Sequence, residues 1–299
     1  MSWRHRAHPP EDWVTHPINI HAHSNASDGV LTIHDIDQKA KEWGGIIGIT
    51  DHNTARAHEL FSSPNILPGI EVKTSEKDCG VDVLLYNTRE KLLVFCDRIV
   101  YPARLPSNPL FGPTRLQLSE LLDRAIEYDC DIVIPHYHHL EGLGVLPHKQ
   151  QRHIAAQYPI TIELNGRLST WANRHAHLFA FLTHRPVIAS ADSHLPQHYT
   201  STYTTIPLPP AISPTSRNLF RSLRRFPQFS RRFLEEPTLT DTIAMSWQTI
   251  RSIGISAVWD YVQRFVCLKP NPLTSRRHGR QEPLPQTWQT SDEDDGDDF

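Results

Sequence analysis

Short apolar segments rich in β-branched residues alternate with helical segments from residue 17 to about residue 226. The segments with strand character are 17–23, 46–52, 66–74, 81–87, 131–137, 160–164 and 186–194. Thr32 is placed to cap a helix that extends through Gly44, and apolar residues recur at helical spacing over 115–128. Because strands and helices alternate over this length, the sequence predicts an α/β protein whose mostly parallel sheet is either open or closed into a barrel.

The chain divides into three predicted regions: an α/β body over 17–226, a helical extension over 227–268 and a disordered acidic tail over 269–299. The tail is rich in proline and charge, and such a composition buries too little apolar surface to fold. Six acids lie within its last eight residues, and without them the formal net charge of -3 becomes +3. A mildly basic body excludes a histone-like nucleic-acid coat but is compatible with a phosphate-bearing substrate.

Histidine is unusually frequent, at 19 of 299 residues, and it is the commonest metal ligand and the side chain that titrates near neutral pH. The four cysteines are scattered singly, so their spacing predicts neither a disulfide framework nor a cysteine-based zinc site. The first residues lack the apolar core of a signal peptide, and no apolar run reaches the roughly 18 residues of a membrane span. These features predict a cytoplasmic protein without a membrane span.

Histidines and carboxylates interrupt the predicted strands near their carboxyl ends. His21 and His23 are two residues apart, which places both imidazoles on the same face of the first strand. In a parallel α/β barrel the carboxyl ends of the strands meet at one face, where active sites lie. The side chains expected to converge there are His21, His23, His52, Glu71, His136, Asp192 and His194, with Asp28 reaching inward from the first loop.

These convergent groups predict a multinuclear metal site. Any one of them, taken alone, is more often a capping residue or a hydrogen-bond partner than a metal ligand. Together they would be costly to bury unpaired, and divalent cations remove that cost. Because the donors are nitrogen and oxygen only, they suit Zn, Mn or Fe and disfavour copper(I) or an iron–sulfur cluster.

Five ordered motifs carry a family resemblance. HAHSNASDG (21–29), ITDHN (49–53), GIE (69–71), IPH (134–136) and ASADSH (189–194) resemble, in this order, the successive motifs of the PHP (polymerase and histidinol phosphatase) superfamily. Members have a distorted seven-stranded (β/α) barrel that holds up to three metal ions and hydrolyses phosphoesters. The resemblance therefore implies a distorted (β/α)7 barrel over 17–226, followed by the C-terminal helical extension.

The resemblance also implies how two or three divalent metal ions (Mn, Zn or Fe) are held. The ligands of the first ion would be His21, His23, Glu71 and Asp192. The second ion would be held by Glu71 and His136, and the third by Asp28, His52 and His194. Many members add a histidine to the second ion from the strand after GIE. Here that strand offers Asp82, a lone carboxylate that either faces water at an edge or points into the barrel mouth.

The predicted function is metal-dependent hydrolysis of a phosphoester, in a small phosphorylated metabolite or a nucleotide, by a metal-bridging hydroxide. Asp192 is our candidate for orienting that hydroxide.

The stretch ELNGR (163–167) is similar to members that carry Asn and Arg there, which implies Asn165 and Arg167 as substrate-binding residues. An arginine fork suits a phosphate oxygen, although a helix-capping role is the alternative. His138 shares the predicted strand face of His136, so it either donates a proton to the leaving group or only hydrogen-bonds nearby.

Three other functions remain open from the sequence. An exonuclease on short RNA or DNA would use the same chemistry, although the short span from Asp82 to His136 leaves little room for a polymer-gripping insertion. A non-catalytic metal-stabilised binding module is a second alternative, against which the intact ligand set argues. A hydrolase of amide or lactone bonds is the third. The arginines of 217–232 form either a phosphate-binding patch or a solvated helix face, and the oligomeric state is left open.

Overall fold

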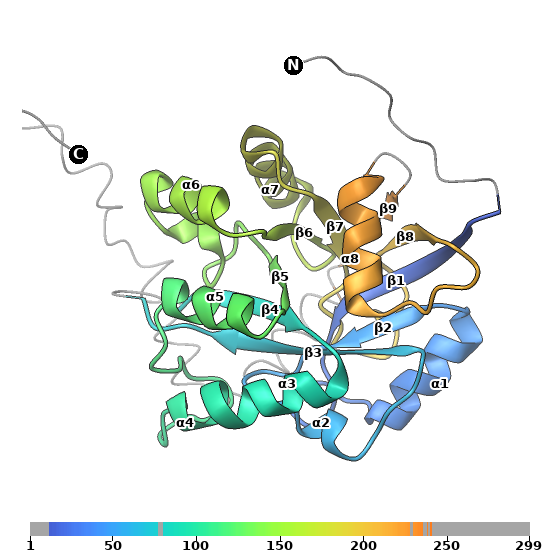
Figure 1. Cartoon of the computed structure of the whole chain (residues 1–299), viewed down its shortest axis with the longest axis horizontal. Coiled ribbons are helices and arrows are strands. Elements are labelled where there is room, and N and C mark those ends of the chain that lie inside the picture. Colours follow the sequence, from blue (N-terminus) through green and yellow to red (C-terminus); the bar gives the residue numbers. More distant parts are fainter. Residues whose placement is uncertain (1–11, 77–79, 228–229, 236–237, 239, 241–299) are drawn as a thin grey trace, which may run out of the picture. The chain divides into compact units, whose positions relative to one another are not determined.

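A computed structural model describes residues 12–76, 80–227, 230–235, 238 and 240. Its strands are β1 (Val14–Ala22), β2 (Ile46–Ile49), β3 (Ile66–Lys73), β4 (Asp82–Tyr86), β5 (Asp131–Ile134), β6 (Thr161–Asn165), β7 (Val187–Ser190), β8 (Tyr203–Leu208) and β9 (Arg231–Phe233). Its helices are α1 (Ile33–Trp43), α2 (Arg56–Glu59), α3 (Arg89–Phe95), α4 (Tyr101–Ala103), α5 (Leu118–Glu127), α6 (His148–Gln157), α7 (Thr170–Thr183) and α8 (Ser216–Arg225), with a π-helical turn η1 (Cys96–Val100) and a 3-10 turn η2 (Leu143–Val145). Figure 1 shows the helices α1, α3, α5, α6 and α7 on the outside of the strands.

The described strands form one sheet in the order β7-β6-β5-β4-β3-β2-β1-β8-β9. Strands β1 to β3 are parallel, as are β5 to β7, whereas β4 is antiparallel to both of its neighbours. The backbone amide of His23 donates to the carbonyl of Ser193 (2.9 Å), and the amide of Ser193 donates to the carbonyl of His21 (3.1 Å). These bonds join the end of β7 to the end of β1, so the sheet is a nearly closed barrel. The predicted α/β barrel fold is confirmed.

Two strands extend the sheet beyond the predicted seven. Strand β8 pairs antiparallel with β1, and β9 pairs antiparallel with β8. The hydroxyl of Thr204 on β8 accepts from the backbone amide of Ala189 (2.7 Å) and donates to its carbonyl (3.1 Å), which links β8 to β7 as well. The sheet therefore continues past residue 226. Of the predicted helical extension over 227–268, the structure describes residues 227, 230–235, 238 and 240. The rest of it and the whole predicted tail over 269–299 lie outside the described residues.

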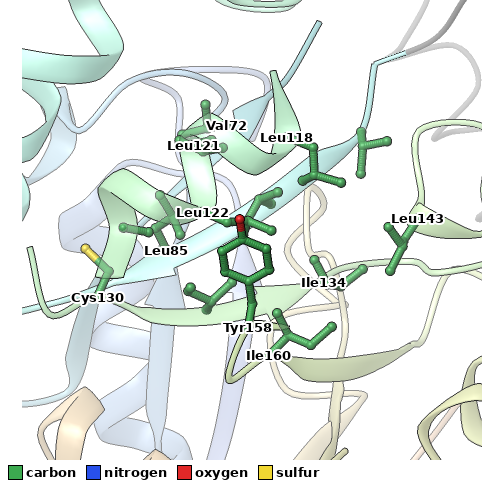
Figure 2. Packing of buried hydrophobic residues seen from close by; sticks show 14 of the residues in the cluster. Val72, Leu85, Leu118, Leu121, Leu122, Cys130, Ile134, Leu143, Tyr158 and Ile160 are labelled. Atoms are coloured by element: carbon green, nitrogen blue, oxygen red, sulfur yellow. The ribbon is translucent and has the colours of Figure 1, made fainter. Parts of the chain in front are cut away.

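Alternation along the strands separates an outer core from the barrel interior. On β4, Val83 and Leu85 pack in the outer core, while Leu84 and Tyr86 belong to the interior cluster. Figure 2 shows the outer core, where α5 lies over the outer faces of β3 to β5. Within the GIE motif, a Cβ on Gly69 would lie 2.8 Å from the Tyr86 ring, so glycine at this position leaves room for that ring.

Helix α8 closes the end of the barrel at which the parallel strands begin. Leu219, Phe220 and Leu223 join the interior cluster, and the Phe220 ring lies 5.4 Å from the Tyr86 ring. The opposite face of α8 exposes arginines, among them Arg224, which pairs with Asp131 (3.3 Å). The arginines of α8 therefore lie at the end of the barrel away from the strand carboxyl ends, whereas Arg231 and Arg232 are on β9. Among the described helices, none is long and apolar enough to cross a membrane.

Candidate metal centre

The reversed direction of β4 brings Asp82 to the same rim as the carboxyl ends of the parallel strands. Asp82 is the first residue of β4, and it has the same parity as the interior residues Leu84 and Tyr86. Its side chain is buried, with 1% of its surface exposed. Of the two orientations considered for this carboxylate, the structure has the one that points into the barrel mouth.

A register shift in β1 turns two histidines toward the same point. Ile18 and Ile20 belong to the interior cluster, so simple alternation would send His21 and His23 to the outer face. The pairing of β1 with β2 shifts between Asn19 and Ala22, which breaks that alternation. As a result, the Nε2 atoms of His21 and His23 lie 3.1 Å apart.

Three groups of side chains at this rim could each hold a metal ion. They are His21, His23 and Asp192; Glu71, Asp82 and His136; and His23, Asp28, His52 and His194. Within each group the candidate ligand atoms all lie within 4.8 Å of one another. All of the metal-ligating residues expected from the sequence are thus brought together, and His23 additionally joins the third group.

Glu71 connects the three groups. Its Oε2 atom lies 3.4 Å from His21 Nε2, 3.3 Å from His23 Nε2 and 3.2 Å from His52 Nδ1. Its Oε1 atom lies 3.1 Å from His136 Nε2. One carboxylate therefore faces four imidazoles, which is the arrangement expected of a ligand shared between metal ions.

The donor set fits divalent cations. The Nε2 atoms of His21 and His23 both face Asp192 Oδ1, at 3.5 and 3.3 Å. Asp82 Oδ1 and His136 Nδ1 are buried without a hydrogen-bond partner, and leaving such atoms unpaired is costly. The described residues therefore hold three buried His/Asp/Glu clusters that are consistent with multiple metal ions bound through nitrogen and oxygen.

Charge at the centre is concentrated on a few carboxylates. Burial alone would raise the pKa of Glu71, but His52 and His21 hold it well below its usual value. Burial opposes ionisation of Asp192 as well, yet Arg167 and His21 lower the pKa of that carboxyl strongly. Burial raises the pKa of Asp82 far above its usual range. Glu71 and Asp192 are thus held in the ionised form, in which a carboxylate can bind a cation.

Glu163 is a site residue that the sequence analysis missed. Its fully buried carboxylate accepts from His21 Nδ1 (2.8 Å), the His136 backbone amide (2.7 Å), Asn165 Nδ2 (2.9 Å) and the Ser190 hydroxyl (2.5 Å). A bond from Nδ1 to a carboxylate leaves the Nε2 atom of His21 free to bind a metal ion, and it would orient that atom toward the ion. The signal was present in ITIEL, where Glu163 is the lone carboxylate of a buried strand, the same pattern that singled out Asp82.

We expect Glu163→Ala to weaken metal binding by about 10–100-fold, the usual effect of removing a partner that orients a ligating histidine. The measurement is a titration of metal-free protein with Mn, followed by metal content from mass spectrometry. Glu127→Gln is the matched control, because Glu127 is exposed and pairs with Arg124 on α5. An affinity equal to wild type in Glu163→Ala would show that His21 is oriented without this carboxylate.

Asp51 fixes the loop that carries Asp28. It accepts from the backbone amide of Ser24 (2.7 Å), the Ser24 hydroxyl (2.6 Å) and the Ser27 hydroxyl (2.6 Å). Held in this way, the loop presents Asp28 Oδ2 to His194 Nε2 at 3.1 Å. The ITDHN motif therefore contributes a candidate ligand in His52 and a loop anchor in Asp51.

Both predicted substrate-binding residues adjoin Asp192. Arg167 Nη1 lies 3.3 Å from Asp192 Oδ2 and 3.1 Å from His194 Nδ1, and its side chain is 24% exposed. Asn165 is fully buried, and its Nδ2 lies 3.3 Å from the same Asp192 oxygen. Ser169, not Arg167, caps α7. The Arg167 side chain is thus partly exposed to solvent at the rim, whereas the buried Asn165 side chain donates a hydrogen bond to the Asp192 carboxylate.

The inference that His138 shares a strand face with His136 is wrong. Strand β5 ends at Ile134, and His136 has a φ of 30°, so strand alternation stops before residue 138. The His138 ring instead packs against α7, and it is the His139 ring that lies 5.1 Å from the His136 ring. His138 belongs to none of the three groups, although it stays on the loop that carries His136.

Comparison with known proteins shows a shared fold. No family model matches the sequence, and no curated protein matches it. A two-domain protein from Bacteroides vulgatus that contains a predicted PHP-like metal-dependent phosphoesterase aligns with a TM-score of 0.50 and 12% identity, over 75% of this chain and 66% of that chain. PsfC from Pseudomonas syringae aligns with a TM-score of 0.54 and 14% identity, over 81% of this chain and 99% of that chain.

Lesion-specific endonucleases have the same fold. PfuEndoQ from Pyrococcus furiosus aligns with a TM-score of 0.57 and 15% identity, over 78% of this chain and 66% of that chain. Endonuclease Q in complex with a 27-mer duplex that carries an abasic lesion aligns with a TM-score of 0.53. The structural neighbours therefore include PHP-like metal-dependent phosphoesterases, and this chain carries buried histidine and carboxylate clusters on that fold. The resemblance read from the sequence motifs is confirmed at the level of fold.

Proposed function

We propose that this protein hydrolyses a phosphoester in a small phosphorylated metabolite or a nucleotide, with two or three divalent cations at the rim of the barrel. The observation that carries the proposal is the Glu71 carboxylate, which faces imidazoles from all three groups. The fold likeness supports the proposal but does not decide the reaction, because one fold hosts many functions.

The residues around Asp192 have complementary roles in this proposal. Bound divalent cations supply Lewis acidity, which polarises a phosphoryl group and acidifies a water molecule. Arg167 binds a phosphoryl oxygen, because its guanidinium is open to solvent and offers a fork of donors. Asp192 orients the attacking water, and Asn165 keeps the Asp192 carboxylate in place.

The test is phosphate release from a panel of phosphomonoesters, nucleotides and short oligonucleotides, with Mn or Zn added. Release from at least one monoester or nucleotide is expected, and chelation of the metal should abolish it. Absence of phosphate release from every monoester and nucleotide, together with absence of oligonucleotide cleavage and with metal content verified, would overturn the proposal. It would instead favour a non-catalytic metal-stabilised module.

A nuclease is the second candidate function. The observation that favours it is the likeness in fold to the lesion-specific endonuclease PfuEndoQ. The chemistry at phosphorus would be the same, and the difference lies in the length of the substrate. Cleavage of oligonucleotides without any hydrolysis of monoesters or nucleotides would replace the first candidate with this one.

We propose that Mn is the preferred metal, because Asp82 stands where a histidine would supply nitrogen. A carboxylate adds negative charge and a hard oxygen donor, which favours Mn over Zn. We therefore expect Asp82→His to shift the metal preference of hydrolysis toward Zn, and Asp82→Ala to empty the group formed with Glu71 and His136 before the others. Metal content by mass spectrometry and activity under each metal measure both effects.

A variant of Glu141, which lies close to Asp82, provides the control for this experiment. Lys73 is the cross-strand partner of Asp82, and its Nζ lies 2.6 Å from Glu141 Oε1. Glu141→Gln changes charge beside Asp82 without removing a candidate ligand, so metal stoichiometry should be kept. If both Asp82 variants retain the wild-type stoichiometry and metal preference, Asp82 is not a ligand.

A cytoplasmic location is also part of the proposal. The cysteines within the described residues, Cys96 and Cys130, are both free and buried, which suits a reducing compartment. The division into a barrel over 17–226, a helical extension and an acidic tail stays a prediction, because most of the chain after residue 235 lies outside the described residues.

A further inference from the structure

A large aromatic side chain is exposed beside the metal centre. Trp171, in the first turn of α7, has 59% of its surface exposed. Asn173 pins this turn to the end of β6, because its side chain accepts from the Asn165 amide (2.8 Å) and donates to the Asn165 carbonyl (2.9 Å). Asn165 in turn contacts Asp192. Trp171 is therefore held at the rim where the candidate ligands converge.

Two histidines flank the indole. The His138 ring meets Trp171 nearly edge to face, with centroids 4.5 Å apart and planes at 73°. His175 stacks on His138 at 4.8 Å and tilts against Trp171 at 4.2 Å. Because His138 is two residues from His136, their Cα atoms are at most about 7 Å apart. The short chain segment between His136 and His138 is therefore a second connection between the metal centre and the aromatic cluster of Trp171, His138 and His175.

The cluster is supported by the core beneath it. Tyr137, between His136 and His138, is buried, and its ring stacks on the Phe179 ring of α7 with centroids 4.6 Å apart. Its hydroxyl donates to Gln151 of α6 at 2.6 Å. The loop that carries His138 is thus fastened to α6 and α7, so the exposed face of Trp171 is presented by a fixed frame.

We propose that Trp171, His138 and His175 form a stacking subsite for a nucleobase, which makes a nucleotide, free or at a strand end, the substrate of the metal centre. The inference rests on the proposed phosphoesterase function and narrows its substrate. An aromatic face stacks on any base, because every base has a π-face. Arg167, four residues before Trp171, contacts Asp192 and is open to solvent. A phosphate at Arg167 and a base at Trp171 suit the two ends of one nucleotide.

Trp171 differs from the other exposed apolar residues of α7, which are Leu178, Phe181 and Leu182, in its position in the first turn of the helix. Phe181 is 69% exposed, but it lies ten residues further along the helix, about 15 Å from Trp171 along the axis. It is therefore away from the rim, and no candidate ligand is tethered to it among the described contacts. Phe181→Ala is the matched control for Trp171→Ala, because both remove an exposed aromatic ring from the same helix.

The experiment compares adenosine monophosphate with ribose 5-phosphate, which carries the same phosphoester without a base. Binding to the Mn-loaded full-length protein is measured by calorimetry with the phosphonate analogue of each ligand, which cannot be hydrolysed, so turnover does not interfere. We expect wild type to bind the nucleotide about tenfold more tightly, within the range that one base stack provides. Trp171→Ala should remove this difference while leaving the affinity for ribose 5-phosphate unchanged. Trp171→Phe should keep most of it, and Phe181→Ala all of it.

The outcomes separate this inference from the proposed function. Equal affinity for the two ligands in wild type, no binding of either, or an equal loss of both in Trp171→Ala would overturn the stacking subsite. Phosphate release without a preference for the base would leave the phosphoesterase function standing alone. Base-dependent binding without phosphate release would remove the function and keep the subsite. A trinucleotide that binds more tightly than the mononucleotide, in a Trp171-dependent way, would identify a strand end as the source of the base.

Discussion

Replacing Glu71 by glutamine is expected to lower phosphoester hydrolysis by at least about 10³-fold. The carboxylate faces His21, His23 and His52 with one oxygen and His136 with the other. Glutamine has the same shape but no negative charge, so this substitution removes the charge that faces imidazoles from all three groups. Stabilisation of transition-state charge by bound cations contributes several kcal/mol, and each 1.4 kcal/mol is about a tenfold change in rate.

Turnover with Mn, metal content by mass spectrometry and far-UV circular dichroism measure this effect. The spectrum should stay near that of wild type, because glutamine has the shape of glutamate and Glu71 lies at the rim of the barrel. Glu127→Gln on α5 serves as the control and should keep full activity. If Glu71→Gln retained more than a tenth of the wild-type turnover with its full metal content, Glu71 would not be the shared ligand.

Removal of the metal ions is expected to abolish hydrolysis and to lower the melting temperature by about 10 °C or more. A ligand that binds only the folded state adds about 4 kcal/mol to the free energy of unfolding when its free concentration is about 1,000 times its Kd. For a domain of about 150–250 residues, each kcal/mol corresponds to roughly 2–4 °C. Loss of a single ion would therefore account for the shift, and it would leave Asp82 Oδ1 buried without a partner.

Calorimetry before and after chelation, and again after Mn is restored, measures the effect. Phe181→Ala should show the full shift, whereas Glu71→Gln should show a smaller one because its sites are already weakened. A melting temperature that stays constant while metal content falls to zero would contradict the expected coupling between the ions and the fold.

Much of the fold was predictable because local patterns carried it. All seven predicted strands are present, and α1 begins with the capping box of Thr32 and Asp35 and ends at Gly44, whose φ is 72°. The ligand candidates other than Asp28 were also predictable, since each lies in or directly after an apolar strand segment where a charged group needs a partner. Glu163 satisfied the same criterion in ITIEL and was overlooked.

Other features depend on contacts between residues distant in the sequence. Alternation gives the face of a strand residue but not the direction of the strand, so nothing in VDVLLY indicated that β4 is reversed and brings Asp82 to the rim. The side chain of Asn19 contributes to closure of the barrel. Its Nδ2 atom donates to the Ser193 hydroxyl, and its Oδ1 atom accepts from the backbone amide of Ala191. His138 was misplaced because β5 ends earlier than its apolar pattern indicated.

The sequence by itself determined the α/β class, the strand segments and the chemical identity of the candidate ligands, because these follow from side-chain type and from spacing along the chain. Only the tertiary structure decided which side chains meet. The register shift in β1 turns His21 and His23 inward, and the reversed β4 adds Asp82 to Glu71 and His136. The physical reason is that strand direction, register and closure are set by hydrogen bonds and packing across the whole barrel, and no short segment of the chain contains that information.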